Sequence, residues 1–399
     1  MVSFLALSVM TNADAAGIRF DVIPSIRLQE GWRSNVYNSS NNEVSSFGTR
    51  VVPGLGLKLT APDDVKLQLT GEYEKIWYYA PDAKNADYGT WNFKVDSSGA
   101  WKFSPNFSMK PSAFYINTID SYRRVQLLPS DDPILPPITI TNYGNTKTQQ
   151  FGGAADFEYL PSPKVTLGVS GNYREKRFSS DNVAGSGLTN DTQVGGGVSF
   201  SYLVSPRSKV GVVASGSHQT FENAGSSNVY QAGIKFDYRF SPQVHLDATF
   251  GESHIRQNSG PGKPDQSKST PSGLFRIYYI SEAFLANLYG SAVYSGGSGF
   301  GETTRLYTTG LTLSGPLAID VSWNLAGTYQ VSRSVFTQND VKINTMHGTG
   351  GLKYQPWRLA YLYLTGTMNR QESTGRYGST INNLSTVLGF TVTNSYNIF

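Results

Sequence analysis

Residue types that commonly carry catalytic or metal chemistry are scarce in this sequence. Its 399 residues include four histidines and no cysteine, so thiolate nucleophiles, thiolate metal sites and disulfides are absent. The sequence holds no HExxH motif, no phosphate-binding glycine loop, and no recognisable Ser-His-Asp arrangement around the histidines. These are His218, His245, His254 and His347. We expect no catalytic residues, no bound metal and no cofactor, with a hydrolase site assembled from distant segments as the alternative.

The charged side chains are the remaining candidates, and they are spread singly along the chain. The net charge is +4, and charged residues make up 16% of the sequence. No basic run of the kind that binds nucleic acid occurs, so no nucleic-acid partner is expected. The charged residues instead recur at alternate positions within segments that are otherwise partly apolar, which indicates that they belong to one face of a larger structure.

Alternation of polar and apolar residues is the main pattern in the chain. From 46 to 59 the odd positions are mainly apolar and the even positions polar or glycine, as in Phe47, Val51 and Leu55 against Arg50 and Lys58. Period two is typical of a β-strand between an apolar and a polar environment. The same pattern covers 65–77, 91–103, 230–240 and 317–330. A mean hydropathy of −0.30 and the lack of an apolar run of ~20 residues exclude a helical membrane protein.

Short and long connections alternate between these segments. Short turns that contain proline lie near 61–64, 104–106, 161–163, 205–207, 241–243, 315–316 and 355–357. Because proline cannot donate a hydrogen bond to a sheet, each is predicted to end a strand. Longer polar stretches lie near 31–45, 80–88, 120–147, 178–190, 221–228, 255–270, 296–303, 332–342 and 371–379. Nine long connections imply about eighteen strands, with sixteen as the alternative.

These features together predict an all-β protein, a transmembrane antiparallel up-and-down β-barrel in the outer membrane of a Gram-negative bacterium. Such barrels have short periplasmic turns, long extracellular loops and an aromatic girdle at each membrane interface. Aromatic residues do lie at both predicted ends of the strands, for example Phe240 and Trp357 beside short turns, and Trp77 and Tyr329 toward long loops. Outer-membrane lipid and the barrel-assembly machinery are the expected partners.

The first residues look like a targeting segment. Residues 1–10 are mostly apolar, and Ala13-Asp14-Ala15 forms an A-x-A cleavage site. We predict a signal peptide over 1–15, whose missing basic region suggests a start further upstream. Residues 16–399 are predicted to form a single outer-membrane barrel domain.

Two sets of charged residues are candidates for a site in the lumen. Basic residues on the predicted inward face beside the short turns form a basic periplasmic mouth, which would bias ion selectivity or simply keep the mouth soluble: Lys58, Lys66, Lys102, Lys110, Lys164, Lys209, Arg239 and Lys353. The longest connection, 120–147, either folds inward as a constriction, as the third loop of general diffusion porins does, or extends outward to a partner. If it folds inward, its candidate constriction residues are Arg123, Arg124, Asp131 and Asp132.

Near the N-terminus, several short motifs resemble a known family. They are Pro24-Ser25-Ile26-Arg27-Leu28-Gln29-Glu30, Trp32, Ser34-Asn35-Val36-Tyr37 and Val52-Pro53-Gly54-Leu55-Gly56-Leu57. This pattern, within about the first 60 residues, resembles the beta-barrel porin 2 family, and related barrels are associated with exopolysaccharide and exosortase gene clusters. The resemblance implies an outer-membrane barrel that serves polysaccharide export, with periplasmic export components as partners.

The sequence therefore predicts a porin-like channel that passes solutes or a secreted polysaccharide through a polar lumen, without covalent chemistry. The alternatives are a structural sheath that encloses a protein partner, and an outer-membrane hydrolase. A sheath would present an inward surface that is apolar and shaped to its partner, whereas the predicted inward face is polar.

Overall fold

The computed structural model describes residues 19–40, 43–61, 65–98, 101–118, 146–178, 188–222, 225–258, 265–295, 303–336, 341–374 and 379–397. The predicted signal peptide lies outside these residues, and so does nearly all of the 120–147 connection. Within the described residues, no helix is long and apolar enough to cross a membrane.

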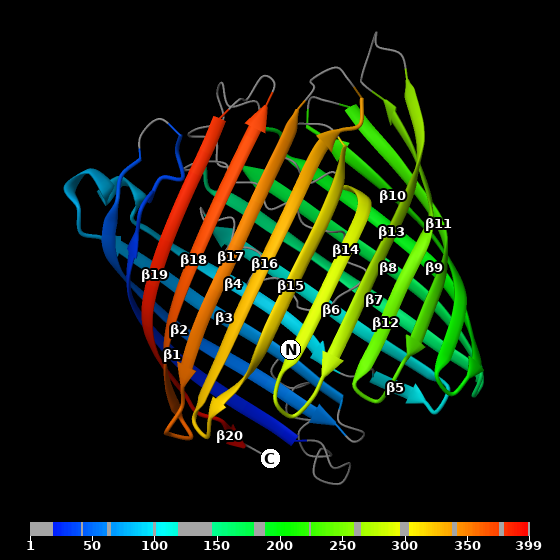
Figure 1. Ribbon diagram of the computed structural model, residues 1–399, viewed down its shortest axis with the longest axis horizontal. Coiled ribbons are helices and arrows are strands. Elements are labelled where there is room, and N and C mark those ends of the chain that lie inside the picture. Colours follow the sequence, from blue (N-terminus) through cyan, green and yellow to red (C-terminus); the bar gives the residue numbers. More distant parts are fainter. Residues whose placement is uncertain are drawn as a thin grey trace, which may run out of the picture.

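All strands belong to one antiparallel sheet that curls into a tilted barrel (Figure 1). The strands are β1 (Arg19–Arg33), β2 (Ser46–Ala61), β3 (Val65–Tyr78), β4 (Tyr88–Ser98), β5 (Trp101–Ser104), β6 (Phe107–Thr118), β7 (Thr148–Ser162), β8 (Val165–Phe178), β9 (Asp191–Ser205), β10 (Ser208–Phe221), β11 (Gly225–Arg239), β12 (Val244–Asn258), β13 (Gln266–Ile280), β14 (Leu285–Ser295), β15 (Thr304–Ala318), β16 (Val321–Ser334), β17 (Lys342–Tyr354), β18 (Ala360–Thr374), β19 (Ser379–Thr393) and β20 (Tyr396–Asn397). A short 3-10 helix, η3 (Pro81–Ala86), lies between β3 and β4.

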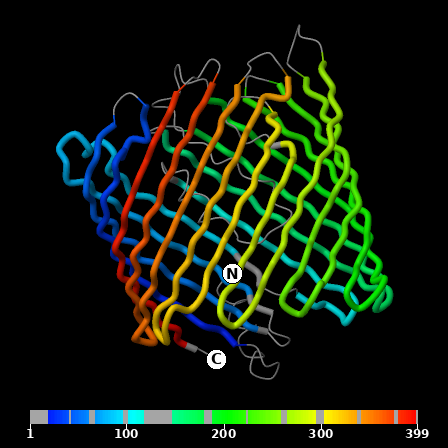
Figure 2. Tube along the Cα trace, in the orientation of Figure 1, coloured from blue at the N-terminus to red at the C-terminus, as the bar shows by residue number. Residues whose placement is uncertain are grey.

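The twenty labelled segments make eighteen strands of the barrel wall. β4 and β5 follow each other along the same neighbour, since both pair with β6. β20 continues β19 along β1. The first and last strands also pair with each other, from Ser25 opposite Thr393 to Arg33 opposite Ser385, and Figure 2 shows them side by side. This pairing closes the barrel, so the prediction of eighteen strands is confirmed and the alternative of sixteen is wrong.

The connections follow the predicted order, with several differences. Two stretches predicted to be long, near 221–228 and 371–379, are short, because β10 ends at Phe221 and β11 starts at Gly225, and β18 ends at Thr374 and β19 starts at Ser379. Gly315 and Pro316 lie inside β15, where the pairing register shifts between Pro316 and Ala318. A bulge tolerates proline because it leaves a residue out of the ladder, so the prediction that a turn starts here is wrong. The turn between β13 and β14 has no proline and was not predicted. Ser281 forms it, because the Phe284 amide donates to Ser281 Oγ at 3.1 Å.

Burial is inverted relative to a water-soluble protein. Large apolar side chains are exposed along the middle of the strands, with Ile234 61% and Phe250 62% exposed. Polar and charged side chains on the other face are buried, with Gln150 1% and Arg174 2% exposed. Cross-strand partners share a face, and the registers are consistent around the whole barrel, so the apolar face points outward everywhere. Such a surface is stable in hydrocarbon, where exposed apolar area costs nothing.

A small packed cap covers the long-connection end of the first strands. Val36, Ile76, Tyr78, Ala83 and Ala86 form its apolar core, which joins the β1–β2 connection to η3. The same connection is tied to the last strand as well, because the side-chain amide of Asn383 donates to the backbone oxygen of Asn35 at 2.9 Å and to Asn38 Oδ1 at 2.5 Å. The Ser34 amide donates to the oxygen of Leu384 at 2.8 Å. Hydrogen bonds from the β1–β2 connection therefore hold β1 and β19 together in addition to the backbone hydrogen bonds between the two strands.

The inverted burial predicts opposite tolerance at neighbouring positions of β12. Phe250→Lys places a charge on the outward face in mid-strand and is expected to lower the free energy of unfolding by about 2–4 kcal/mol. Thr249→Lys, one residue away on the inward face, is expected to change it little. Unfolding in lipid vesicles, followed by denaturant titration, measures both. Equal losses in the two variants would contradict the assigned faces.

Candidate functional site

The inner wall of the barrel is the candidate site. Its residues follow from the register, because Asp21 lies opposite Lys58 and Lys58 lies opposite Gln68, and Asp21 is only 2% exposed. Continuing such rows from strand to strand returns to β1 through the pairing of Arg27 with Thr391. Each strand therefore contributes every second residue to the lumen, and these residues are mostly polar.

Along each strand, the half near the long connections differs from the half near the short turns. In the half near the long connections, inward polar side chains are buried on most strands of the described chain. We call this set of side chains the outer collar. It comprises Gln29, Ser46, Glu72, Glu74, Thr90, Asn92, Gln150, Arg174, Lys176, Asp191, Gln193, Gln219, Ser227, Ser253, Gln257, Thr270, Thr304, Gln330, Ser332, Thr345, Asn369, Gln371 and Asn383. Since even arginine and lysine are buried there, this level of the lumen is not a wide open bore.

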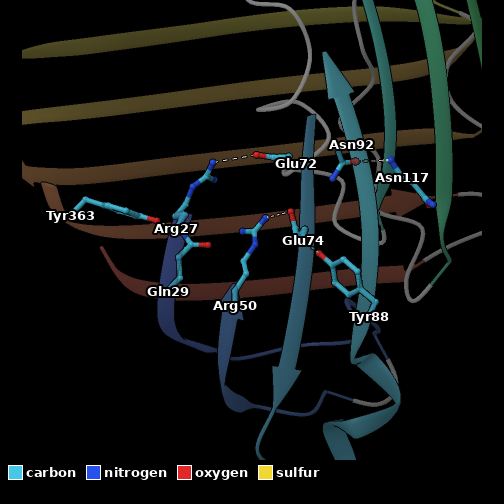
Figure 3. A network of polar contacts seen from close by, with 9 residues as sticks. All are labelled: Arg27, Gln29, Arg50, Glu72, Glu74, Tyr88, Asn92, Asn117 and Tyr363. Atoms are coloured by element: carbon cyan, nitrogen blue, oxygen red, sulfur yellow. Dashed lines mark hydrogen bonds and ion pairs between the residues drawn. The ribbon is translucent and has the colours of Figure 1, made fainter. Parts of the chain in front are cut away.

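One part of the outer collar is an ion-pair network on β1–β4 (Figure 3). Arg27 lies 3.3 Å from Glu72 and Arg50 lies 2.5 Å from Glu74, measured between a guanidinium nitrogen and a carboxylate oxygen. The Arg50–Glu74 pair is diagonal, since Arg50 stands opposite Ile76 in register. The Arg27–Glu72 pair reaches from β1 across β2 to β3. Glu74 has no exposed surface, and it also accepts a 2.7 Å hydrogen bond from the Tyr88 hydroxyl. The two arginines and two glutamates thus offset each other's charge.

A second part of the outer collar joins β8, β9 and β10. Arg174 donates to Gln193 Oε1 at 2.7 Å, and Gln219 donates to Asp191 Oδ1 at 3.2 Å. Lys176 Nζ lies 3.6 Å from Asp191 Oδ2. All five side chains are buried, so their hydrogen bonds replace the water they would otherwise need. Sequence reasoning missed this group because alternation assigns a face but does not say which side chains on that face meet.

The residues of the predicted basic mouth lie in the half of the barrel near the short turns. The structure places Lys58, Lys66, Lys102, Lys110, Lys209, Arg239 and Lys353 near the short-turn ends of their strands, in inward register, and Lys164 in the turn between β7 and β8. Lys102, Lys110, Lys164 and Arg239 are exposed, and Lys58, Lys209 and Lys353 are half-buried. The positions are spread around the barrel rather than gathered in one cluster.

Aspartates interrupt this basic mouth. Lys58 stands directly opposite Asp21, Lys110 opposite Asp156, and Lys209 opposite Asp237. Opposite charges across strands attract each other, so three of the predicted cations have an acidic neighbour in register. The wall at the predicted mouth is therefore mixed in charge at these points.

Two inward tyrosines lie flat along the wall in a shared arrangement. Tyr289 on β14 crosses Gly310 on β15, and its hydroxyl lies 2.9 Å from Thr328 Oγ1 on β16. Tyr363 on β18 crosses Gly389 on β19 and hydrogen-bonds Gln29 on β1. A Cβ atom at either glycine would overlap the ring, so glycine is required for this close approach. Each ring lies close to the glycine backbone that it crosses, and both tyrosines are half-buried.

The four histidines are separated from one another. In inward register, His245 Nε2 lies 3.0 Å from Asp237 Oδ1, and His347 hydrogen-bonds Asn369. His218 and His254 lie on the outward face, near Asn228 and Ser269 respectively. Within the described residues, no group of three or more His, Asp or Glu side chains could hold a metal ion.

The candidate constriction residues Arg123, Arg124, Asp131 and Asp132 lie outside the described residues, so their role stays a prediction.

A closed antiparallel barrel with an apolar outer face is a protein of the Gram-negative outer membrane, because closure leaves no unpaired backbone in the hydrocarbon.

Comparisons with solved structures give distant matches along nearly the whole chain. The chain is similar to the crystal structure of Pseudomonas aeruginosa OpdK with vanillate, at 12% identity and a TM-score of 0.47, covering 95% of this chain and 99% of that one. It is also similar to Acinetobacter baumannii OccAB3, at 10% identity and a TM-score of 0.45, covering 96% of this chain and 100% of that one. No protein-family model matches the chain. No curated protein matches its sequence.

The network of Figure 3 predicts unequal roles for two neighbouring glutamates. Glu74→Gln removes the carboxylate that lies 2.5 Å from the largely buried Arg50 guanidinium and is expected to lower the free energy of unfolding by roughly 3 kcal/mol. Glu72→Gln removes the partner of Arg27, whose side chain is 29% exposed, and is expected to cost under about 1 kcal/mol. Denaturant titration of the refolded variants in vesicles checks both values. A loss of the same size in both would show that burial of the pair is not the deciding factor.

Proposed function

We propose that this protein is a passive, porin-like channel of the outer membrane that passes polar solutes or a secreted polysaccharide. The observation that carries the proposal is the polar inner wall of a closed eighteen-stranded barrel. A barrel of this strand number is too wide for its own side chains to fill completely and leaves an aqueous lumen. The exposed charges near the short turns fit a wide periplasmic entrance, and the buried outer collar fits a narrower passage beyond it.

Polysaccharide is the substrate class that one observation favours. The rings of Tyr289 and Tyr363 lie against the wall, so the face turned away from the backbone is directed at the lumen. Sugar rings bind such faces because their C–H bonds carry partial positive charge and the aromatic face is negative. The resemblance of the first strands to the beta-barrel porin 2 family points to the same substrate class. In this proposal, periplasmic export components deliver the polymer to the short-turn end.

A structural sheath fits the inner wall less well. An enclosed protein partner would have to satisfy or exclude water from many charged groups, including Lys94, Lys110 and Glu158, at a large desolvation cost. We also propose no covalent chemistry, because transport down a gradient requires only a wetted path.

Planar-bilayer recordings test the channel and its mouth together. The refolded barrel is expected to give stable open steps, and the reversal potential in a salt gradient gives its ion preference. Lys58→Gln combined with Lys110→Gln and Lys209→Gln is expected to shift this potential toward cations, because the aspartates opposite them remain. Lys75→Gln, on the outward face of β3, is the matched control and should leave it unchanged.

An absence of conductance at every voltage would contradict an open channel. A potential that moves equally in the control variant would contradict the assignment of the three lysines to the lumen wall.

Soluble oligosaccharides test the substrate class in the same recordings. We expect them to block the current from the side of the short turns, and we expect Tyr289→Ala to raise the blocking concentration by about fivefold or more, the loss of roughly 1 kcal/mol of ring contact. Tyr307→Ala is a matched control, since Tyr307 faces outward on β15. Block that is unchanged in Tyr289→Ala, or no block at all, would leave a channel for small solutes and remove the polysaccharide proposal.

A further inference from the structure

Three basic residues form a row on the outward face of the barrel, at the end near the long connections. Arg305 on β15 stands directly opposite Arg333 on β16, and Arg333 stands directly opposite Lys342 on β17. The residues beside them along each strand, Leu306, Ser332 and Ile343, face inward and are 0–2% exposed. The three cations therefore share one outward surface, which we call the cation row.

The cation row lies just beyond the apolar band. On the same outward face, Tyr307 follows Arg305 two residues along β15, and Tyr329 and Met346 lie four residues from Arg333 and Lys342. These three side chains are 37%, 42% and 47% exposed. Tyrosines at the edge of an apolar band mark the membrane interface, so the row lies at the level of the lipid headgroups of the outer leaflet.

No ion pair joins the cation row to an acidic side chain within the described residues; Glu372, diagonal to Lys342 on β18, pairs with Arg370 instead. Arg305 donates to the neutral backbone oxygen of Pro271 at 2.8 Å, and its guanidinium lies 4.9 Å from the centre of the Tyr307 ring. Among the described residues, neither Arg333 nor Lys342 has an ion-pair or hydrogen-bond partner through its side chain. Like charges directly opposite each other destabilise a sheet, so the row is unfavourable as it stands.

Other outward cations near the same end show the contrast. Arg177 pairs with Glu175, Arg256 pairs with Asp265 at 2.8 Å, and Arg370 pairs with Glu372. Each of these is neutralised on its own strand or across its own connection. The cation row thus differs from these three cations, each of which has its own carboxylate.

We propose that the cation row binds the phosphate group of a phosphorylated outer-leaflet lipid. A guanidinium presents paired N–H donors that match phosphate oxygens, and a lysine adds a mobile positive charge beside them. A lipid is the favoured source of the phosphate because the row faces away from the lumen and borders the band where acyl chains lie. Basic groups near a membrane surface each contribute about 1 kcal/mol to binding an anionic lipid.

Lipid binding to the purified, refolded barrel in a neutral detergent tests the proposal. Native mass spectrometry with phosphorylated lipid A gives the dissociation constant, and dephosphorylated lipid A and inorganic phosphate are the comparison ligands. Arg333→Gln combined with Lys342→Gln is expected to raise the constant for phosphorylated lipid A by about thirtyfold. Arg177→Gln combined with Arg256→Gln removes two outward cations that are already paired and lie away from β15–β17, and should change it less than threefold.

Thermal unfolding of the same proteins gives a second, independent readout. Without lipid, the Arg333→Gln and Lys342→Gln double variant is expected to melt above the wild type, because the repulsion in the row is gone. With phosphorylated lipid A the order should reverse. If the double variant does not refold, Lys342→Gln alone is used, with an expected rise of about fivefold in the dissociation constant.

Equal binding of phosphorylated and dephosphorylated lipid, or equal losses in the two double variants, would overturn the proposal. Binding of inorganic phosphate as tight as that of the lipid would overturn the lipid as the source.

Discussion

Backbone hydrogen bonding in a medium without water is the constraint on which the rest of this structure depends. Hydrocarbon offers no partner for an amide or a carbonyl, so a sheet can cross it only when the first strand meets the last. Here β1 pairs with both β2 and β19, and the ladder has no free edge. Closure fixes the strand number, the strand number sets the width of the lumen, and the tilt of the strands decides which inward side chains meet.

The side chains on the two faces of the sheet meet opposite requirements, contact with hydrocarbon outside and with a polar lumen inside. Outside, each leucine or isoleucine contributes about 1.5–3 kcal/mol in hydrocarbon relative to water. Inside, charges are crowded together, and the wall neutralises them locally, as in the pairs of Arg27 with Glu72 and Arg50 with Glu74. The cation row at the outer rim follows neither pattern, since it is charged, faces outward and forms no ion pair among the described residues. Because the inward pairs are balanced locally, a group of charges that is not balanced is a candidate binding surface.

Much of the architecture could be predicted from the sequence because period two ties hydrophobicity directly to a face. Alternation placed Lys58, His245 and His347 on the inward face, and the register agrees. Proline marked most turns, but a bulge can hold Pro316 within β15, and the turn at Ser281 depends on a serine hydroxyl that gives no comparable signal. The outer collar was not predictable either. Its contacts run diagonally between strands, and the stagger that creates them is set by closure rather than by any single segment.

The seam between β1 and β19 has a consequence for how such a chain can be made. Its residues come from the two ends of the described chain, so this ladder, with the Asn35, Asn38 and Asn383 contacts beyond it, has the highest sequence separation in the fold. Contacts of this kind carry the greatest chain-entropy cost and form late. Until the C-terminal strand arrives, the growing sheet has two open edges, which are prone to pair with other chains. Some template must therefore hold these edges during synthesis and insertion, and a chain shortened by its last strand would leave both of them exposed.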